Sequence, residues 1–227
     1  MRALILAAGR GERLRPLTDT VPKPLLMAGG RTLVDRQVEG LVRAGFTDLV
    51  VNHAHLGAMI EAALGDGARY GARIVYSPES PALETAGGIA KALHFFEGEP
   101  FALASSDIHT EFDYASLHAH VDAIAHDFPS RVAHFVLVDN PPWHEQGDMG
   151  LAAGRITRAG PHLTYGNIAV FHPAIFREIA PDTRLKLFPW AYRWVDEGRV
   201  TGEHYRGPWD NVGTPEQLAA LDGRLSR

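Results

Sequence analysis

Cysteine is absent from the 227-residue sequence. Its absence excludes disulfides, zinc sites built on thiolates and cysteine nucleophiles, and it is typical of a protein from a reducing compartment. Long apolar runs are missing as well. The run Ala3–Ala8 near the amino terminus is far shorter than the roughly 18 residues of a membrane span, and charged residues follow it at once. We therefore expect a soluble cytoplasmic protein without membrane contact.

An excess of basic charge is also lacking, since the formal net charge is −5. A general nucleic-acid binder is usually basic, so this class of protein is disfavoured. Only three of the 22 basic residues are lysines, namely Lys23, Lys91 and Lys186. The hydrophobic content of 45% is ample for one core. We expect a single domain over residues 1–227, with a first half at about 1–110 and a second at about 111–227.

The first 25 residues contain the most informative stretch. The apolar run at Ala3–Ala8 is typical of a buried parallel strand, and Gly9-Arg10-Gly11 interrupts it. A glycine-rich loop after a strand presents backbone N–H groups to one point, which suits a phosphate. Lys23 lies between Pro22 and Pro24, so a stiff extended segment presents its ammonium group. Five basic residues against two acidic ones in this stretch also favour an anionic ligand.

Two familiar glycine motifs are excluded at this loop. A dinucleotide fingerprint needs a third glycine after Gly9-x-Gly11, and the relevant positions hold Arg13, Leu14 and Arg15. A Walker loop needs Gly-x-x-x-x-Gly-Lys-Ser/Thr, which the stretch does not contain. The Gly-x-Ser-x-Gly elbow of many hydrolases is missing too.

Strands and helices alternate after the loop, which indicates βαβ units and a parallel sheet. Short apolar runs predict strands at Leu49–Val51, Ile74–Tyr76, Phe101–Ala104 and Val132–Val138. Helical spacing predicts helices over about 33–44, 56–64, 85–96 and 113–126. Ligands of such sheets bind outside the carboxyl ends of the strands. This rule places Gly9–Gly11, His53, Glu79 and Asp107 around one crevice.

The second half has a different pattern. Leu163–Phe171 is a strand candidate interrupted by Gly166-Asn167, and Val200–Tyr205 should be another strand. A mostly apolar surface predicts a helix over about 184–197. Thr214 followed by Pro215 is a strong helix start, and that helix should run to Leu225.

Several residues near the predicted crevice can carry chemistry. Asp107 follows a buried strand, where a carboxylate can reach Mg²⁺, although a turn or helix cap is the common role of such an aspartate. Glu84 can accept a hydrogen bond from a base or sugar, and the alternative is a capping arrangement around Thr85. Lys186 either reaches a phosphate or buries its stem with an exposed ammonium.

The 12 histidines raise the question of a metal site. His53-x-His55 and His118-x-His120 are the close pairs, and neither has the i,i+4 spacing of a helical zinc site. Residues i and i+2 of a helix do not share a face, and a third ligand is not evident from the sequence. We expect these histidines to be surface or core-edge residues.

The combination Gly9-x-Gly11-x-Arg13-x-x-Pro16-Leu17-Thr18, followed by Pro22-Lys23-Pro24-Leu25, resembles the signature of sugar-1-phosphate nucleotidyltransferases. The resemblance implies an α/β fold with a mixed, mainly parallel Rossmann-like sheet flanked by helices. It also implies transfer of a nucleoside monophosphate from a nucleoside triphosphate to a sugar 1-phosphate, with Mg²⁺ as cofactor. The first half would then bind the nucleotide and the second half the sugar, in a monomer or small homo-oligomer.

The resemblance also implies roles for individual residues. Arg13, Lys23 and Asp107 would be catalytic, and the nucleotide would contact Leu6, Ala7, Ala8, Gly9, Gly11, Glu12, Arg13, Lys23, Glu79, Glu84, Thr85 and Ser106. The sugar phosphate would contact Asn140, Gly147, Asp148, Tyr165, Asn167 and Lys186. Asp107 and Asn211 would hold the metal ion.

This sequence departs from the family at two of these positions. Ser106 stands where the family has glycine, and the hydroxymethyl group could crowd the site. Asn211 stands where the family has aspartate. An amide oxygen can ligate Mg²⁺ without contributing negative charge, so the ion should be held less tightly.

Within the family, the whole chain most resembles the short bacterial N-acetylmuramate-1-phosphate uridylyltransferases of peptidoglycan recycling, which use UTP. The segments that carry this likeness are Ser77–Glu79, Leu83–Thr85, Val138–Pro141, Gly147-Asp148 and Gly202–Gly207. Mannose-1-phosphate guanylyltransferase and glucose-1-phosphate thymidylyltransferase are alternatives, because a few loop contacts decide the base. A nucleotide-sugar-binding protein with weakened catalysis is a third alternative, which Ser106 and Asn211 favour.

Overall fold

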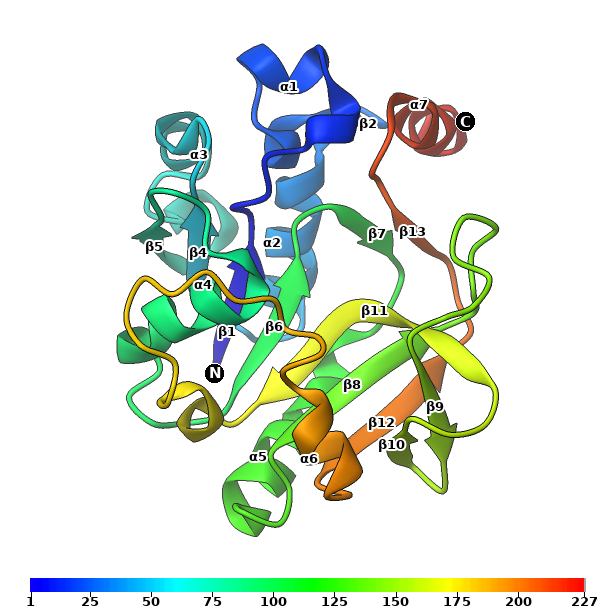
Figure 1. The fold of residues 1–227 in the computed structure, drawn as a ribbon. Coiled ribbons are helices and arrows are strands. Elements are labelled where there is room, and N and C mark those ends of the chain that lie inside the picture. The colour runs from blue at the N-terminus through cyan, green and yellow to red at the C-terminus, as the bar shows by residue number, and fades with distance from the viewer. Residues whose placement is uncertain (227) are drawn as a thin grey trace.

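The computed structural model describes residues 1–226, and a nine-stranded mixed sheet forms its centre, in the order β5-β4-β1-β6-β11-β8-β12-β10-β9 (Figure 1). The strands of this sheet are β1 (Arg2–Leu6), β4 (Asp48–His53), β5 (Arg73–Pro78), β6 (Phe101–Ser105), β8 (Ala133–Val138), β9 (Met149–Ala152), β10 (Arg155–Thr157), β11 (His162–Phe171) and β12 (Val200–Tyr205). Strands β2 (Met27–Ala28) and β3 (Arg31–Thr32) form a separate ribbon, as do β7 (Ile108–Thr110) and β13 (Trp209–Asn211).

The sheet is parallel from β5 through β4 and β1 to β6, as the alternation of strands and helices predicts. Beyond β6 the pattern changes because β11 inserts between β6 and β8 and runs antiparallel to both. β12 is again parallel to β8, and the β9–β10 hairpin closes that edge. The fold is therefore the expected mixed α/β type. The parallel half places the ends of β1 and β6 side by side.

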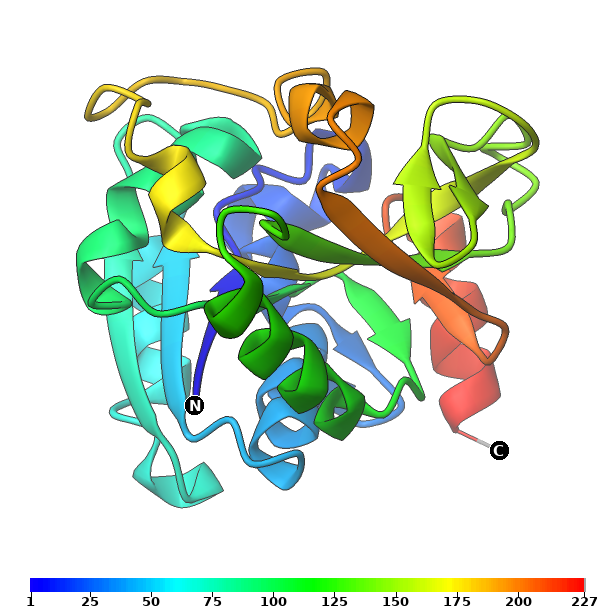
Figure 2. The same cartoon turned by 90° about the horizontal axis from the view of Figure 1, so that it is seen from below.

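Helices cover both faces of the sheet (Figure 2). Their bounds are α1 (Leu17–Thr20), α2 (Leu33–Arg43), α3 (Gly57–Leu64), α4 (Glu84–Ala92), α5 (Leu117–Asp127), α6 (Tyr192–Asp196) and α7 (Pro215–Leu225). Helices α4 and α6 pack on one face, and α2, α3 and α5 pack on the other. Successive side chains of β1 point to opposite faces of the sheet, so Leu4 packs in the core beneath α4 and Ile5 packs in the core beneath α2.

A small third core joins the amino-terminal loop to the end of the chain. Leu14 and Leu33 pack there against Val212 and Leu221 of the carboxyl-terminal segment. The Thr214 hydroxyl accepts a hydrogen bond from the Gln217 N–H and caps α7, which begins and ends where the sequence predicts. This packing brings residues about 200 positions apart to one end of the sheet.

The helix expected over 184–197 is wrong, because only Tyr192–Asp196 is helical. Residues 183–186 lie outside any helix or strand and are tied to the start of α4, and residues 187–191 form a bend and a turn. The Leu185 N–H donates to the Leu83 carbonyl, and the Leu185 carbonyl accepts from the Ala86 N–H, each at 2.9 Å. These bonds replace the helical ones, and Pro189 has no N–H to offer a helix. The apolar side chains there still pack into the core, as Leu187 is 4% exposed.

The predicted interruption of β11 at Gly166-Asn167 is confirmed. The register with β8 shifts between Tyr165 and Ile168, and Asn167 adopts a left-handed backbone with φ of 58°. This bulge turns Asn167 toward the strand ends that carry the site described below. No helix in the part of the chain that the structure describes is both long and apolar enough to cross a membrane.

Candidate active site

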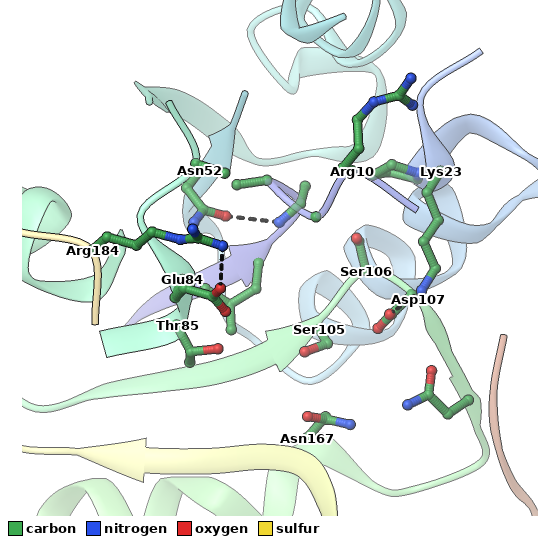
Figure 3. Close-up of a pocket in the computed structure, with 17 residues that line it drawn as sticks. Arg10, Lys23, Asn52, Glu84, Thr85, Ser105, Ser106, Asp107, Asn167 and Arg184 are labelled. Atoms are coloured by element: carbon green, nitrogen blue, oxygen red, sulfur yellow. Dashed lines mark hydrogen bonds and ion pairs between the residues drawn. The ribbon is translucent and has the colours of Figure 1, made fainter. Parts of the chain in front are cut away.

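A cavity of about 400 Å³ opens at the carboxyl ends of β1 and β6, where the strand order predicts a ligand (Figure 3). This volume is in the range of small-molecule sites. Eleven residues that we singled out in the sequence line the cavity: Leu6, Ala7, Ala8, Gly9, Lys23, Glu84, Thr85, Ser106, Asp107, Asn167 and Asn211. The structure thus brings together residues from six separate stretches of the chain.

The wall formed by the end of β1 is fixed by a buried hydrogen-bond relay. The side-chain oxygen of Asn52 accepts from the Ala7 N–H at 2.7 Å, and the Asn52 amide donates to Glu79 at 2.7 Å. The other carboxylate oxygen of Glu79 accepts from the Leu83 N–H at 2.7 Å. Burial raises the pKa of Glu79 above its usual value. Glu79 therefore acts on the loop through Asn52 and does not line the cavity itself.

Lys23 reaches the cavity because the glycine loop lies directly against its stem. Gly11 has φ of 69°, and a Cβ there would lie 2.9 Å from Thr18 Cγ2 and 3.2 Å from Lys23 Cβ. The Thr18 hydroxyl donates to the Gly11 carbonyl at 2.9 Å and holds the turn closed. Gly11 is thus required by both conformation and space, although it does not line the cavity.

Lys23 and Asp107 form an ion pair inside the cavity. Their Nζ and Oδ2 atoms lie 2.5 Å apart, and the two side chains are 11% and 26% exposed. The Ser106 N–H donates to the Leu6 carbonyl and extends the β1–β6 pairing, which aims the next residue, Asp107, into the cavity. A cation and a carboxylate therefore face the same space.

Asn211 lies beside Asp107 because β13 pairs with β7, and the Val212 N–H donates to the Asp107 carbonyl at 2.8 Å. The Asn211 side-chain oxygen is buried and has no hydrogen-bond partner within residues 1–226. An unpartnered oxygen next to a carboxylate fits a hard divalent cation such as Mg²⁺. Asp210 is not part of this pair, since its carboxylate binds Arg224 of α7.

The opposite wall is formed by α4 and the extended segment after Asp182. Glu84 and Arg184 form an ion pair of 2.8 Å at this wall, with Thr85 beside them (Figure 3). Glu84 has φ of 62°, in the left-handed region that non-glycine residues rarely adopt. Strained residues of this kind cluster at functional sites.

Comparison with known proteins shows the family of the chain. Residues 2–149 match the model of the family described as "Nucleotidyl transferase". The chain belongs to the nucleotidyl transferase family. It is 43% identical over 220 residues to the N-acetylmuramate alpha-1-phosphate uridylyltransferase of Neisseria meningitidis serogroup B, covering 94% of each chain. It is 34% identical over 238 residues to the enzyme of the same name from Caulobacter vibrioides, covering 99% of this chain and 96% of the relative.

A solved structure confirms the fold of this nucleotidyl transferase. A Bacillus anthracis protein described as a glucose-1-phosphate thymidylyltransferase superposes with a TM-score of 0.84 over 100% of this chain and 96% of its own. Their sequences are 20% identical, so this likeness concerns the fold alone.

Nine residues singled out in the sequence of the nucleotidyl transferase do not line the cavity: Gly11, Glu12, Arg13, Glu79, Asn140, Gly147, Asp148, Tyr165 and Lys186. Glu12 is exposed and paired with Arg15 at 3.4 Å. The Arg13 guanidinium lies against Gly213, where a Cβ would be 2.8 Å from it. Lys186 is exposed. His53, which we expected at the crevice, does not line the cavity either. It is buried, and its Nε2 lies 2.7 Å from a Glu61 carboxylate oxygen.

Four of the nine belong to an internal network between the 140–148 loop and β11. The Asn140 amide donates to the carbonyls of Glu145 and His162, and Asp148 accepts from the Tyr165 N–H at 2.8 Å. Gly147 fits so closely that a Cβ would lie 2.7 Å from the Asn140 side-chain oxygen. These residues hold the loop in place with their polar atoms. Asn140 also lines a second cavity of about 330 Å³, which shares Asn211 with the first.

Six lining residues were not assigned a role at the site from the sequence: Arg10, Pro24, Asn52, Ala82, Ser105 and Arg184. The position of Asn52 at the carboxyl end of the strand next to β1 was an available signal. Arg184 had no local signal, because only the hydrogen bonds between Leu185 and the start of α4 bring it to the cavity.

Proposed function

We propose that this nucleotidyl transferase transfers UMP from UTP to N-acetylmuramate 1-phosphate and releases pyrophosphate. The assignment of the reaction rests on the ion pair of Lys23 and Asp107 and on the unpartnered oxygen of Asn211 beside it. The choice of substrates rests on the named meningococcal relative, which matches 94% of each chain at 43% identity. We place the reaction in the cytoplasm, where UTP is available.

The bond changes follow from the chemistry of phosphates. An oxygen of the sugar phosphate attacks the α-phosphorus of UTP, the bond to the bridging oxygen of the β-phosphate breaks, and its electron pair leaves with pyrophosphate. The attacking oxygen is already ionised near neutral pH, so no general base is required. The protein has to align the two phosphates and neutralise their charge.

The residues at the site are suited to these tasks. Lys23 would contact the α-phosphate and the incoming sugar phosphate, and the N–H groups of the Ala7–Gly11 loop would hold the remaining phosphates. Arg13, which is exposed beside the Asn211 segment, would stabilise the departing pyrophosphate. Glu84 and Thr85 would face the nucleoside.

Asp107 and Asn211 are the residues that would hold Mg²⁺. When bound, the ion would neutralise charge that develops on the triphosphate. The donor set is one carboxylate and one amide oxygen, so we expect weaker binding than with two carboxylates.

We assign the nucleotide to about residues 1–110 and the sugar to about residues 111–227. The cavity of about 400 Å³ would take the nucleotide, and Asn167 and Asn211 border the side that faces the second half. The network of Asn140, Gly147, Asp148 and Tyr165 would shape the sugar side, and Lys186 would approach the sugar phosphate from the surface.

The test is pyrophosphate release by the purified protein with Mg²⁺, four nucleoside triphosphates and a panel of sugar 1-phosphates. We expect release with UTP and N-acetylmuramate 1-phosphate. Preference for GTP with mannose 1-phosphate, or for dTTP with glucose 1-phosphate, would replace the proposed substrates. Tight UTP binding without release would show a binding protein in which Ser106 and Asn211 have weakened catalysis.

A further inference from the structure

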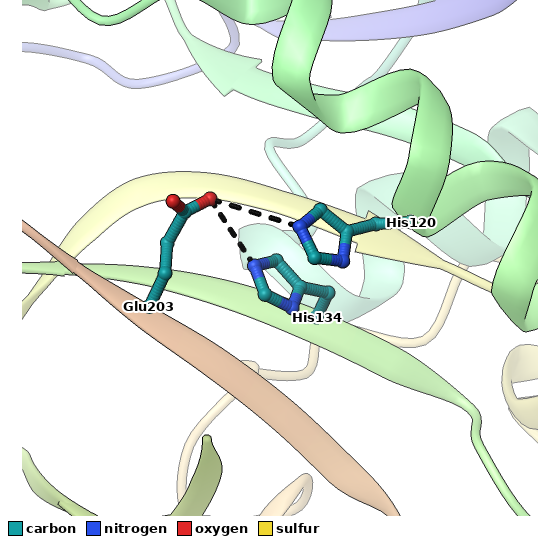
Figure 4. A group of neighbouring side chains, drawn as sticks. All are labelled: His120, His134 and Glu203. Carbon is teal, nitrogen blue, oxygen red and sulfur yellow. Dashed lines mark hydrogen bonds and ion pairs between the residues drawn. The ribbon is translucent and has the colours of Figure 1, made fainter.

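A second group of chemically competent side chains lies between α5 and the sheet, separate from the catalytic cavity. His120 comes from α5, His134 from β8 and Glu203 from β12 (Figure 4). One ligand atom from each lies within 4.8 Å of the other two, and this is the one such group of histidine and acidic residues within residues 1–226. None of the three lines the cavity that contains Asp107.

The spacing of the three ligand atoms fits a small divalent ion. His134 Nε2 lies 3.3 Å from Glu203 Oε1, and His120 Nε2 lies 4.0 Å from the same oxygen. Two ligands that each lie 2.0–2.1 Å from a tetrahedral zinc ion are about 3.4 Å apart. The imidazole rings stack with centroids 3.5 Å apart, so the lone pair of His120 must turn toward the ion. Its side chain is 29% exposed.

The contacts of His134 hold its ring in one orientation. Its Nδ1 lies 2.9 Å from the Thr201 hydroxyl oxygen, and its Nε2 lies 3.3 Å from Glu203 Oε1. Nε2 therefore points at the Glu203 carboxylate, where a cation would take the place of the proton between them. The bond to Thr201 also fixes the ring, as partners of metal-binding histidines do.

Solvent access also suits an ion. His134 is 2% exposed, whereas the Glu203 side chain is 36% exposed and opens the group to solvent. An ion from solvent can thus reach the buried His134 beside the partly exposed Glu203.

We propose that His120, His134 and Glu203 form a site for a zinc-type divalent cation, with water as the fourth ligand. Two imidazole nitrogens and one carboxylate oxygen are a typical zinc donor set, whereas Mg²⁺ and Ca²⁺ prefer oxygen ligands alone. The ion joins α5 to β8 and β12 and so stabilises the second half of the sheet. The site does not depend on the transfer reaction proposed above.

The test is a calorimetric titration of the chelator-treated full-length protein with zinc chloride at neutral pH. We expect one site in the wild type and the same site in Asp107→Asn, which alters only the catalytic cavity. His120→Ala and Glu203→Gln should each weaken zinc binding by more than about 100-fold. His126→Ala is the matched control, because it removes an exposed histidine from the same helix and should change nothing.

Thermal unfolding with and without zinc distinguishes binding at this site from binding elsewhere on the protein. Zinc should raise the unfolding midpoint of the wild type, of Asp107→Asn and of His126→Ala, but not that of His120→Ala or Glu203→Gln. Circular dichroism without metal shows whether each variant is folded, and both ligand substitutions are at partly exposed positions. Equal zinc affinity in the wild type and His120→Ala would overturn the proposal. So would loss of binding in Asp107→Asn alone, which would place the ion in the catalytic cavity.

Discussion

The ammonium nitrogen of Lys23 lies 2.5 Å from a carboxylate oxygen of Asp107, at the point where β6 ends. We assign a phosphate to Lys23 and a metal ion to Asp107. Without ligands, the two side chains neutralise each other. Mg²⁺ and the phosphates must therefore replace one ion pair with two new contacts. The pair keeps both side chains aimed into the cavity before the substrates arrive, which lowers the cost of ordering them.

Replacing Lys23 with alanine should nearly abolish turnover. The variant loses the charge that we place on the α-phosphate, and removal of one such stabilising group costs about 10²–10³-fold in rate. Pyrophosphate release under saturating substrates measures the loss. Lys91→Ala is the matched control, because Lys91 is paired with Asp182 at 2.8 Å outside the cavity and should leave the rate unchanged. Retained turnover in a folded Lys23→Ala protein would contradict the mechanism.

Substitutions of Asn211 should move the magnesium requirement in opposite directions. Asn211→Ala removes the unpartnered oxygen, so half-maximal activity should need about tenfold more Mg²⁺. Asn211→Asp adds a negative charge beside Asp107 and should lower the requirement by a similar factor. A magnesium titration of activity at fixed UTP checks both. Identical curves for the two variants and the wild type would show that Asn211 is not a ligand.

The amino-terminal half of the site could be predicted from sequence because its signals are local. An apolar run, two glycines and a lysine between prolines predict the strand, the loop and the ammonium group within 25 residues. Asp107 followed from the rule that ligands bind beyond the carboxyl ends of parallel strands. Each of these features depends on backbone conformation near its own position.

The features that sequence reasoning missed depend on contacts between distant residues. Nothing local indicates that β11 inserts between β6 and β8, or that Leu185 pairs with Leu83 and breaks the expected helix. The same contact carries Arg184 to the cavity. The sequence gives no signal for a site at His120, because His118 and His120 are two positions apart on a helix and do not share a face. Its partners His134 and Glu203 come from two other strands.

Asn52 should be a positioning residue whose loss affects both stability and nucleotide binding. Asn52→Ala leaves the Ala7 N–H and a Glu79 oxygen buried without their partner, which costs about 1–3 kcal/mol. The loop that we assign to phosphate also loses its anchor, so the KM for UTP should rise more than kcat falls. Urea unfolding and steady-state kinetics measure the two effects.

The matched control for Asn52 is Ser77→Ala on the neighbouring strand. Ser77 pairs in register with Asn52 and is also buried, but its hydroxyl has no partner within residues 1–226. Its removal should therefore leave both stability and KM close to the wild type. Equal effects of the two substitutions would show that the hydrogen-bond relay is not responsible.

Glu84→Gly should separate stability from nucleotide recognition. Glycine relieves the left-handed backbone, worth roughly 1–2 kcal/mol, and this offsets the lost ion pair with Arg184 and the low helix propensity of glycine. The free energy of unfolding should stay within about 1 kcal/mol of the wild type. The KM for UTP should rise about tenfold if the carboxylate accepts a hydrogen bond from the nucleoside. Asp182→Gly relieves a similar φ of 55° and should leave KM unchanged, whereas an unaltered KM in Glu84→Gly would make Glu84 a purely structural residue.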